Sequence, residues 1–259
     1  MNSGAPATLP PLTRRMLGWE IIVVFSVSLG ASALFAIINL IGSLTAPKAL
    51  RQQQALLVGS LAPGRPLLDL TLQLANILVA LAPVALVFYL LARDGEGPAV
   101  LGIDTTRPAS DLLRGAVLAA LIGGSGLALY IAAYHLGISL NVVPENLPAI
   151  WWRIPVLVLD AAQNGILEEI LVLGYLLRRL DQLGWAPGKA IALAAVVRGS
   201  YHLYQGFGGF IGNAILGVIF GVLYRRWGRV TPMIIAHTLI DAGAFVGYAA
   251  LHGHVSWLP

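Results

Sequence analysis

The chain has 259 residues, 58% of them hydrophobic and 11% charged, and its mean hydropathy is +0.80. Soluble domains carry roughly 25% charged residues, so this composition excludes an ordinary soluble domain. It indicates an all-α fold, a polytopic transmembrane helix bundle. The net charge of +4 fits the basic loops of a membrane protein and does not indicate a nucleic-acid partner. The absence of cysteine excludes disulfides, thiolate catalysis and cysteine-ligated zinc.

The N-terminal residues differ in composition from the rest of the chain. MNSGAPATLPPLT is polar and proline-rich, and it lacks the basic region and apolar core of a cleaved signal peptide. We expect residues 1–15 to form a disordered cytoplasmic tail. Residues 16–259 are expected to form a single membrane domain.

A membrane span needs about 20 mainly apolar residues. Seven segments qualify, or eight if the long first segment divides in two. In chain order they are Leu17–Ala46, Leu67–Ala92, Leu112–Gly137, Trp152–Leu177, Lys189–Tyr204, Gly209–Tyr224 and Val230–Leu251. The fifth and sixth are short, and the glycine-rich residues 205–209 between them predict a turn.

Lysine and arginine in the connecting segments predict the orientation, because they are enriched on the cytoplasmic side. The more basic side holds Arg14, Arg15, Arg93, Arg107, Arg114, Arg178, Arg179, Lys189, Arg225, Arg226 and Arg229. The other side holds Lys48, Arg51, Arg65 and Arg153. We therefore expect a multi-pass integral membrane protein of a bacterial plasma membrane, with a cytoplasmic N-terminus and an external C-terminus.

The sixth segment carries glycines at a helical spacing of four. The pairs are Gly208 with Gly212 and Gly217 with Gly221. Small residues at this spacing let two helix backbones approach closely. Packing inside one bundle is favoured over a dimer interface.

Ionisable residues interrupt three of the apolar segments at similar depth. Counted from the nearest cytoplasmic basic residue at about 1.5 Å per residue, Glu168, His202, His237 and Asp241 lie about 12–20 Å deep. This is the middle of a hydrocarbon layer roughly 30 Å thick. The three segments are therefore expected to share one site.

Helix geometry separates the two adjacent glutamates. Neighbouring helical residues point about 100° apart, whereas residues four apart share a face. Glu168 therefore shares a face with Asn164 and Asp160, which are expected to line a water-accessible cleft. Glu169 points elsewhere and needs a partner of its own.

Unpaired charges in hydrocarbon cost about 3 kcal/mol each on insertion scales, so pairing is expected. We expect Arg198 to pair with a carboxylate and Glu168 to face His202 across a water molecule. A carboxylate, a water and an imidazole suffice for general-base hydrolysis. Glu168, His202 and His237 are also candidate ligands for zinc, the one cofactor considered. The helical zinc motif HExxH is missing.

Three motifs, taken in order, resemble those of the CPBP family of intramembrane proteases. They are Glu168-Glu169, then His202 in RGSYHLYQG, then His237 and Asp241 four residues apart. This family includes the CAAX prenyl endopeptidases and the bacteriocin-processing or bacteriocin-immunity (Abi) proteins. The resemblance covers about residues 150–245 and implies a helical bundle with a membrane-embedded cleft. It implies Glu168 as general base, His202 as its partner, and His237 with Asp241 on the oxyanion or metal side.

Two positions depart from the family pattern. Leu173 stands where the family has an arginine four residues after the second glutamate, and Arg198 stands where it has a phenylalanine. One guanidinium is lost and one is gained at similar depth. We therefore expect Arg198 to form a structural ion pair with Glu169 near the site.

The sequence thus predicts a metallo- or glutamic endopeptidase that cleaves a peptide or protein substrate in the lipid bilayer. The substrate class includes membrane-anchored and prenylated chains. Two alternatives remain. One is a non-catalytic protein of the same fold, of the bacteriocin-immunity type or acting on a membrane partner, which the two departures would allow. The other is a proton-coupled transporter, against which the lack of an internal repeat argues.

Overall fold

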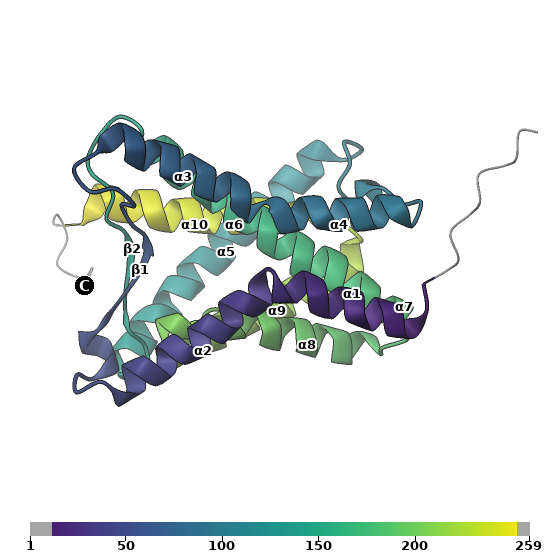
Figure 1. The fold of residues 1–259 in the computed structure, drawn as a ribbon, viewed down its shortest axis with the longest axis horizontal. Coiled ribbons are helices and arrows are strands. Elements are labelled where there is room, and N and C mark those ends of the chain that lie inside the picture. Colours follow the sequence, from purple (N-terminus) through teal and green to yellow (C-terminus); the bar gives the residue numbers. More distant parts are fainter. Residues whose placement is uncertain (1–11, 253–259) are drawn as a thin grey trace, which may run out of the picture.

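The computed structural model describes residues 12–252, which form a helical bundle (Figure 1). The N-terminal part contains α1 (Arg14–Ser26), α2 (Leu29–Thr45), η1 (Leu50–Gln52), β1 (Gln54–Val58), α3 (Pro66–Ala80), α4 (Ala82–Arg93), η2 (Pro98–Leu101) and α5 (Pro108–His135). The C-terminal part contains β2 (Asn141–Glu145), α6 (Arg153–Glu168), the π-helical η3 (Glu169–Leu176), α7 (Leu177–Gln182), α8 (Pro187–Ser200), η4 (Leu203–Gln205), α9 (Phe207–Trp227) and α10 (Thr231–Leu251). Most of the predicted N-terminal tail, residues 1–11, lies outside the described residues.

Within residues 12–252, four helices are long and apolar enough to cross a membrane: Pro66–Arg93, Pro108–His135, Phe207–Trp227 and Thr231–Leu251. A fifth is added if α1 and α2, which meet at a 54° bend, count as one broken span. The chain is therefore an all-α integral membrane protein, but the predicted seven or eight spans are not confirmed. Of the remaining predicted segments, Trp152–Leu177 carries three carboxylates and Lys189–Tyr204 yields only a 14-residue helix.

The C-terminal helices enclose the middle of the bundle. α10 packs against α5 and α6, and α8 packs against α9. The predicted turn between the fifth and sixth segments is confirmed, since Gly206 adopts a φ of 97° immediately before α9. A Cβ atom there would also lie 2.8 Å from the carbonyl oxygen of Ile138, so glycine is required.

Two of the regularly spaced glycines lie at the α8–α9 contact. A Cβ atom built on Gly217 would lie 2.9 Å from Cα of Ala195, and one on Gly221 would lie 3.0 Å from the side chain of Ile191. The expectation that this pattern serves packing within one bundle is confirmed for these two positions. The close approach also brings α9 against Arg198, whose Cδ would lie 3.3 Å from the Gly217 Cβ.

Two short parallel strands were not expected from the sequence. In the described part of the chain, β1 and β2 form a two-stranded sheet, with Gln54 opposite Asn141 and Val58 opposite Glu145. The sheet connects the ends of α2 and α3 at one end of the bundle (Figure 1). β2 contains Pro144, and proline is tolerated in a strand whose edge needs no N–H donor at that position.

Two buried arginines hold the opposite end together. The side chain of Arg179 is fully buried and lies 2.7 Å from Glu20 on α1 and 2.8 Å from Asp94 after α4. Arg229, between α9 and α10, pairs with Asp111 at the start of α5 at 2.6 Å. Breaking such a pair leaves a buried charge without a partner, which is costly. These contacts therefore fix how the helices pack near the arginine-rich end.

Candidate active site

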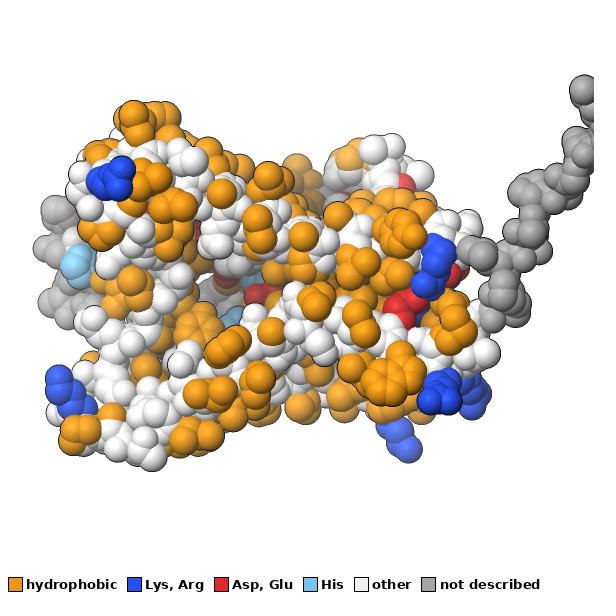
Figure 2. All heavy atoms as spheres, in the orientation of Figure 1, with side chains coloured by type: hydrophobic (Ala, Val, Ile, Leu, Met, Phe, Trp, Pro, Cys, Tyr) orange, Lys and Arg blue, Asp and Glu red, His pale blue; other side chains and the backbone are white. Residues whose placement is uncertain are grey.

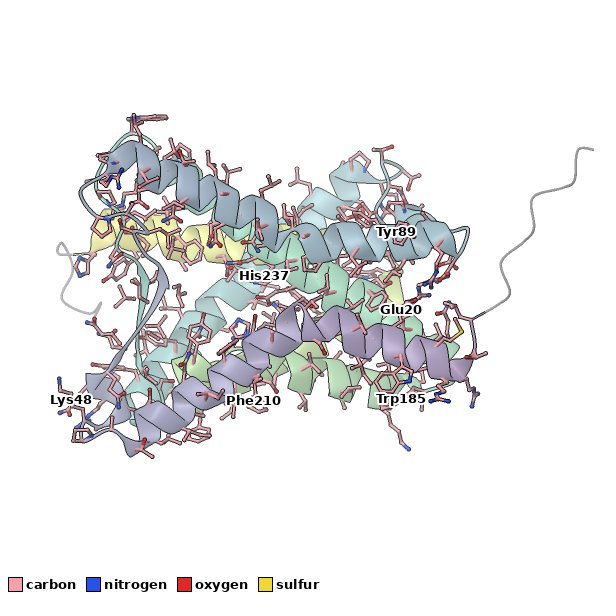
Figure 3. The ribbon with its side chains drawn as sticks, viewed as in Figure 1. Glu20, Lys48, Tyr89, Trp185, Phe210 and His237 are labelled. Atoms are coloured by element: carbon pink, nitrogen blue, oxygen red, sulfur yellow. The ribbon has the colours of Figure 1, made fainter. Side chains whose placement is uncertain are left out.

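The polar residues predicted at mid-depth converge in the structure. Glu168 and Glu169 lie at the junction of α6 and η3, Arg198 lies near the end of α8, and His237 lies on α10. Figure 3 places His237 near the middle of the bundle. Four of the site side chains are buried: Glu168, Glu169, Arg198 and His237. Three segments that are distant in sequence therefore form one polar cluster inside an apolar bundle.

The helix changes its winding at the glutamate pair. α6 ends at Glu168 and a π-helical stretch begins at Glu169. π-helical turns are rare and occur frequently at functional sites. Glu169 is completely buried, whereas Glu168 keeps 8% of its surface exposed. The two carboxylates thus have different surroundings, as their helical spacing predicts.

Arg198 lies between the two glutamates. Its Nη1 donates to Oε1 of Glu169 at 2.6 Å, and its Nη2 lies 3.5 Å from Oε2 of Glu168. The guanidinium also lies over the ring of Phe220, 5.6 Å from its centre. Glu169 lacks the arginine that the family has at position 173. In this structure Arg198 supplies that cation from α8.

His237 completes the buried half of the cluster. Its Nδ1 lies 2.8 Å from Oε1 of Glu169 and 3.2 Å from Nη2 of Arg198. A guanidinium can only donate and a carboxylate can only accept. The shorter contact therefore assigns the Nδ1 proton to the bond with Glu169. Among the described residues, Oε2 of Glu169 and Nε of Arg198 have no hydrogen-bond partner, so this pair depends on its few contacts.

The other half of the cluster faces His202. The Nδ1 of His202 lies 3.0 Å from the carbonyl oxygen of Arg198. A carbonyl oxygen only accepts, so Nδ1 carries the proton and the neutral ring has its lone pair on Nε2. That Nε2 lies 3.9 Å from Oε1 of Glu168. Two acceptors therefore face each other at a separation that a shared water can bridge by donating to both.

Tyr201 is a site residue that the sequence reasoning missed. Its hydroxyl donates to Oε2 of Glu168 at 2.8 Å, and the residue is buried. On a continuing helix, Tyr201 would point about 100° away from His202. α8 ends at Ser200, however, and both residues lie in the turn that follows. Its position next to His202 was the only available signal.

Asp241 and the α6 polar stripe lie on the far side of His237. The Nε2 of His237 lies 3.5 Å from Oδ2 of Asp241, one helical turn along α10. The amide of Asn164 lies 3.5 Å from the same oxygen. Asp160, one turn before Asn164, is half-buried. The structure therefore brings Asn164 and Asp241 together across the α6–α10 contact.

The surface is hollowed beside this cluster. Figure 2 shows a hollow between α2 and α3, next to the sheet, in which acidic and histidine side chains are visible. His237 occupies the same part of the view in Figure 3. A cleft that reaches polar side chains in an apolar bundle is the default location of a membrane enzyme's site.

The candidate zinc ligands do not form a coordination shell. A tetrahedral zinc site needs at least three protein donors around one point. In residues 12–252, no three histidine or acidic side chains are grouped so that they could hold a metal ion. His237 has its Nδ1 bonded to Glu169, and His202 and Glu168 supply only two donors. The arrangement of these donors thus does not fit a zinc site.

One family model matches the part of the chain that contains the site residues. A family model described as Type II CAAX prenyl endopeptidase Rce1-like matches residues 150–243. No protein of curated function and no solved structure is significantly similar to the chain. The matched segment runs from α6 into α10 and contains every predicted catalytic residue. The resemblance seen in the three motifs is therefore confirmed for residues 150–243, which are similar to the type II CAAX prenyl endopeptidases.

Proposed function

We propose that this protein is an intramembrane endopeptidase that hydrolyses a peptide bond with a water activated by Glu168 and His202. The observation that carries the proposal is the pair of facing acceptors, Oε1 of Glu168 and Nε2 of His202, 3.9 Å apart. A water that donates to both is held and polarised at one point. The low-dielectric surroundings strengthen these contacts.

The proposed reaction balances with these side chains alone. Glu168 takes a proton from water while the water oxygen bonds to the carbonyl carbon of the substrate. Glu169 holds Nδ1 of His237, so only Nε2 can act on the substrate: when protonated it turns from Asp241, 3.5 Å away, to donate to the negative oxygen of the tetrahedral intermediate. Glu168 then returns its proton to the amide nitrogen, and the carbon–nitrogen bond breaks. Asn164 and Asp160 line the cleft that admits the substrate.

The membrane setting and the family description support a proposal for the substrate class. We propose a peptide or protein with a membrane-anchored or prenylated segment. The test compares a fluorescent CAAX peptide with and without a farnesyl group, using the protein in bilayers in ¹⁸O-labelled water. Hydrolysis places one labelled oxygen in the new carboxylate, as mass spectrometry would detect. No cleavage of either peptide, by protein that is folded, would favour the non-catalytic alternative.

Tyr201→Phe is expected to lower the rate of hydrolysis by about tenfold, the loss of roughly one hydrogen bond to a charged group. The hydroxyl of Tyr201 holds one oxygen of Glu168 and so aims the other at His202. Peptide cleavage at saturating substrate is the measurement. Tyr204→Phe is the matched control, since its hydroxyl accepts from Gln205 instead. Equal rates in wild type and Tyr201→Phe would remove Tyr201 from the site.

Purified protein is expected to contain less than one zinc per chain, because the donors do not surround one point. Elemental analysis of wild type beside His202→Ala measures this directly. Cleavage is expected to survive dialysis against a chelator. Near-stoichiometric zinc that falls in His202→Ala would establish a metal site here and contradict the metal-free reaction.

We also propose that seven helical segments cross the bilayer: the apolar segments α3–α4, α5, α9 and α10, together with α1–α2, α6–α7 and α8. In this arrangement the arginine-rich end, near Glu20 in Figure 3, faces the cytoplasm, and the end with Lys48 faces outward. The chain has no cysteine, so single cysteines report their side cleanly. A thiol reagent that cannot cross the membrane should label Lys48→Cys in whole cells, and Asp181→Cys only after lysis. The reverse pattern would invert the orientation.

A further inference from the structure

The sheet at the end of the bundle has one open edge and one closed edge. Asn141 donates its backbone N–H to the carbonyl of Gln53 at 2.9 Å. In a parallel pair alternate residues face the partner strand, so Gln54 and Leu56 direct their N–H and C=O groups away from β2. Both residues are exposed, and within residues 12–252 no other strand pairs with β1.

The outer edge of β2, by contrast, offers few donors. The N–H of Val142 is bonded to the hydroxyl of Tyr130 at 3.0 Å. Pro144 has no N–H group. Proline and occupied donors are devices that close a sheet edge against further pairing. Only the β1 edge is therefore suited to receive another strand.

A cavity of about 350 Å³ adjoins the sheet on the face shared by the Leu56 and Val143 side chains. It is lined by Gln54, Leu56, Val143, Glu145, Asn146, Leu147, Arg153, Tyr248 and His252. Glu145, which is 1% exposed, pairs with Arg153 and accepts from the N–H of Leu147 at 2.9 Å. The acidic group is thus already satisfied, and the leucines and valine are left to contact an apolar side chain.

We propose that an extended segment of the substrate binds as a third strand on β1 and places one apolar side chain in this cavity. This inference rests on the proposed function and names how its substrate is held. Alternating backbone donors and acceptors match another peptide backbone, whereas an acyl chain cannot satisfy them. Strand addition with a side-chain pocket is an established mode of peptide recognition.

The sheet is physically joined to the active-site loop. The N–H of Leu140, just before β2, donates to the carbonyl of Gln205 at 3.0 Å, three residues after His202. Tyr248, which lines the cavity, follows Asp241 by seven residues and His237 by eleven on α10, about 10 and 16 Å. An extended peptide advances about 3.3 Å per residue. A segment docked on β1 therefore places the scissile bond about three to five residues away.

The test measures binding rather than cleavage. The full-length Glu168→Gln protein in bilayers is titrated with a fluorescent farnesylated CAAX peptide. A set of peptides carries one N-methyl group each, moved one residue at a time. Strand pairing predicts losses of affinity of about fivefold to tenfold at alternate positions and little loss between them, since alternate N–H groups face β1. The affected positions should lie three to five residues from the cleaved bond.

Protein variants supply the second arm. Leu56→Pro removes the outward N–H without removing a bond to β2, so it should weaken binding by a similar factor. Leu56→Ala keeps the N–H and should lose only the side-chain contact. Affinity that is absent, or that shows no alternation along the peptide, would overturn the docking site. Wild-type protein that binds with alternation but never cleaves would overturn the proposed function and leave the docking site standing.

Discussion

Glu168→Gln is expected to reduce peptide hydrolysis by about a thousandfold, since general-base catalysis contributes on the order of 10²–10⁴. The amide keeps the size of the side chain and can still accept the hydrogen bond from Tyr201. It cannot take a proton from water at neutral pH. The substitution thus removes the proposed chemistry and leaves the packing of α6 and η3 in place.

The matched control is Glu96→Gln. Glu96 is also a glutamate paired with an arginine, Arg178, but it lies between α4 and η2 at the arginine-rich end. The Glu96→Gln protein should cleave the peptide at the wild-type rate. Thermal unfolding in detergent should be unchanged in Glu168→Gln, within a few degrees. If Glu168→Gln cleaves as fast as the control, the water must be activated elsewhere, and the facing pair would lose its role.

The different surroundings of the two glutamates were predictable, because they follow from helix geometry alone. Adjacent residues diverge, so one glutamate could face the cleft and the other the interior. The same rule, applied to His237 and Asp241, predicted their shared face, and they lie 3.5 Å apart. Depth counted from basic residues brought the three segments to one level. Helical periodicity and the thickness of the membrane thus predicted which of these polar residues lie close together.

Contacts that depend on how helices end and rotate were not predictable. The contact of His237 with Glu169 requires the rotation of α10 against α6, which no spacing within one helix reports. The π-helical stretch has the same apolar residues as an ordinary helix. Tyr201 joins the site only because α8 stops at Ser200. The sheet pairs residues 54–58 with residues 141–145, and such distant pairings depend on the assembled bundle.

The span count shows the same limit. Apolar length identifies α3–α4, α5, α9 and α10, which need no partner to be stable in lipid. The predicted segment Trp152–Leu177 is not among the helices apolar enough to count as spans, because its charges are acceptable in lipid only beside Arg198 and His237. A membrane segment that carries ionisable side chains is therefore the hardest to recognise as a span from its hydrophobicity.

Arg198→Leu is expected to cost about 3–5 kcal/mol of stability, the usual penalty for breaking a buried ion pair from one side. It leaves Glu169, which has no exposed surface, without its guanidinium partner. Glu169 also accepts from Nδ1 of His237, so a shift of Glu169 would displace His237, and activity should fall with stability. Thermal unfolding in detergent and peptide cleavage are the two measurements.

Two companion variants decide whether the loss comes from the pair. Glu169→Leu combined with Arg198→Leu removes both charges and should be more stable than Arg198→Leu alone. Leu173→Arg combined with Arg198→Phe restores the family pattern, because it moves the arginine from α8 to position 173 in η3. Leu173 is fully buried, four residues after Glu169. This exchange should recover most of the stability, because it returns a guanidinium to the same carboxylate. An Arg198→Leu protein that folds and cleaves normally would show instead that Glu169 needs no cation, and the compensation between positions 173 and 198 would be rejected.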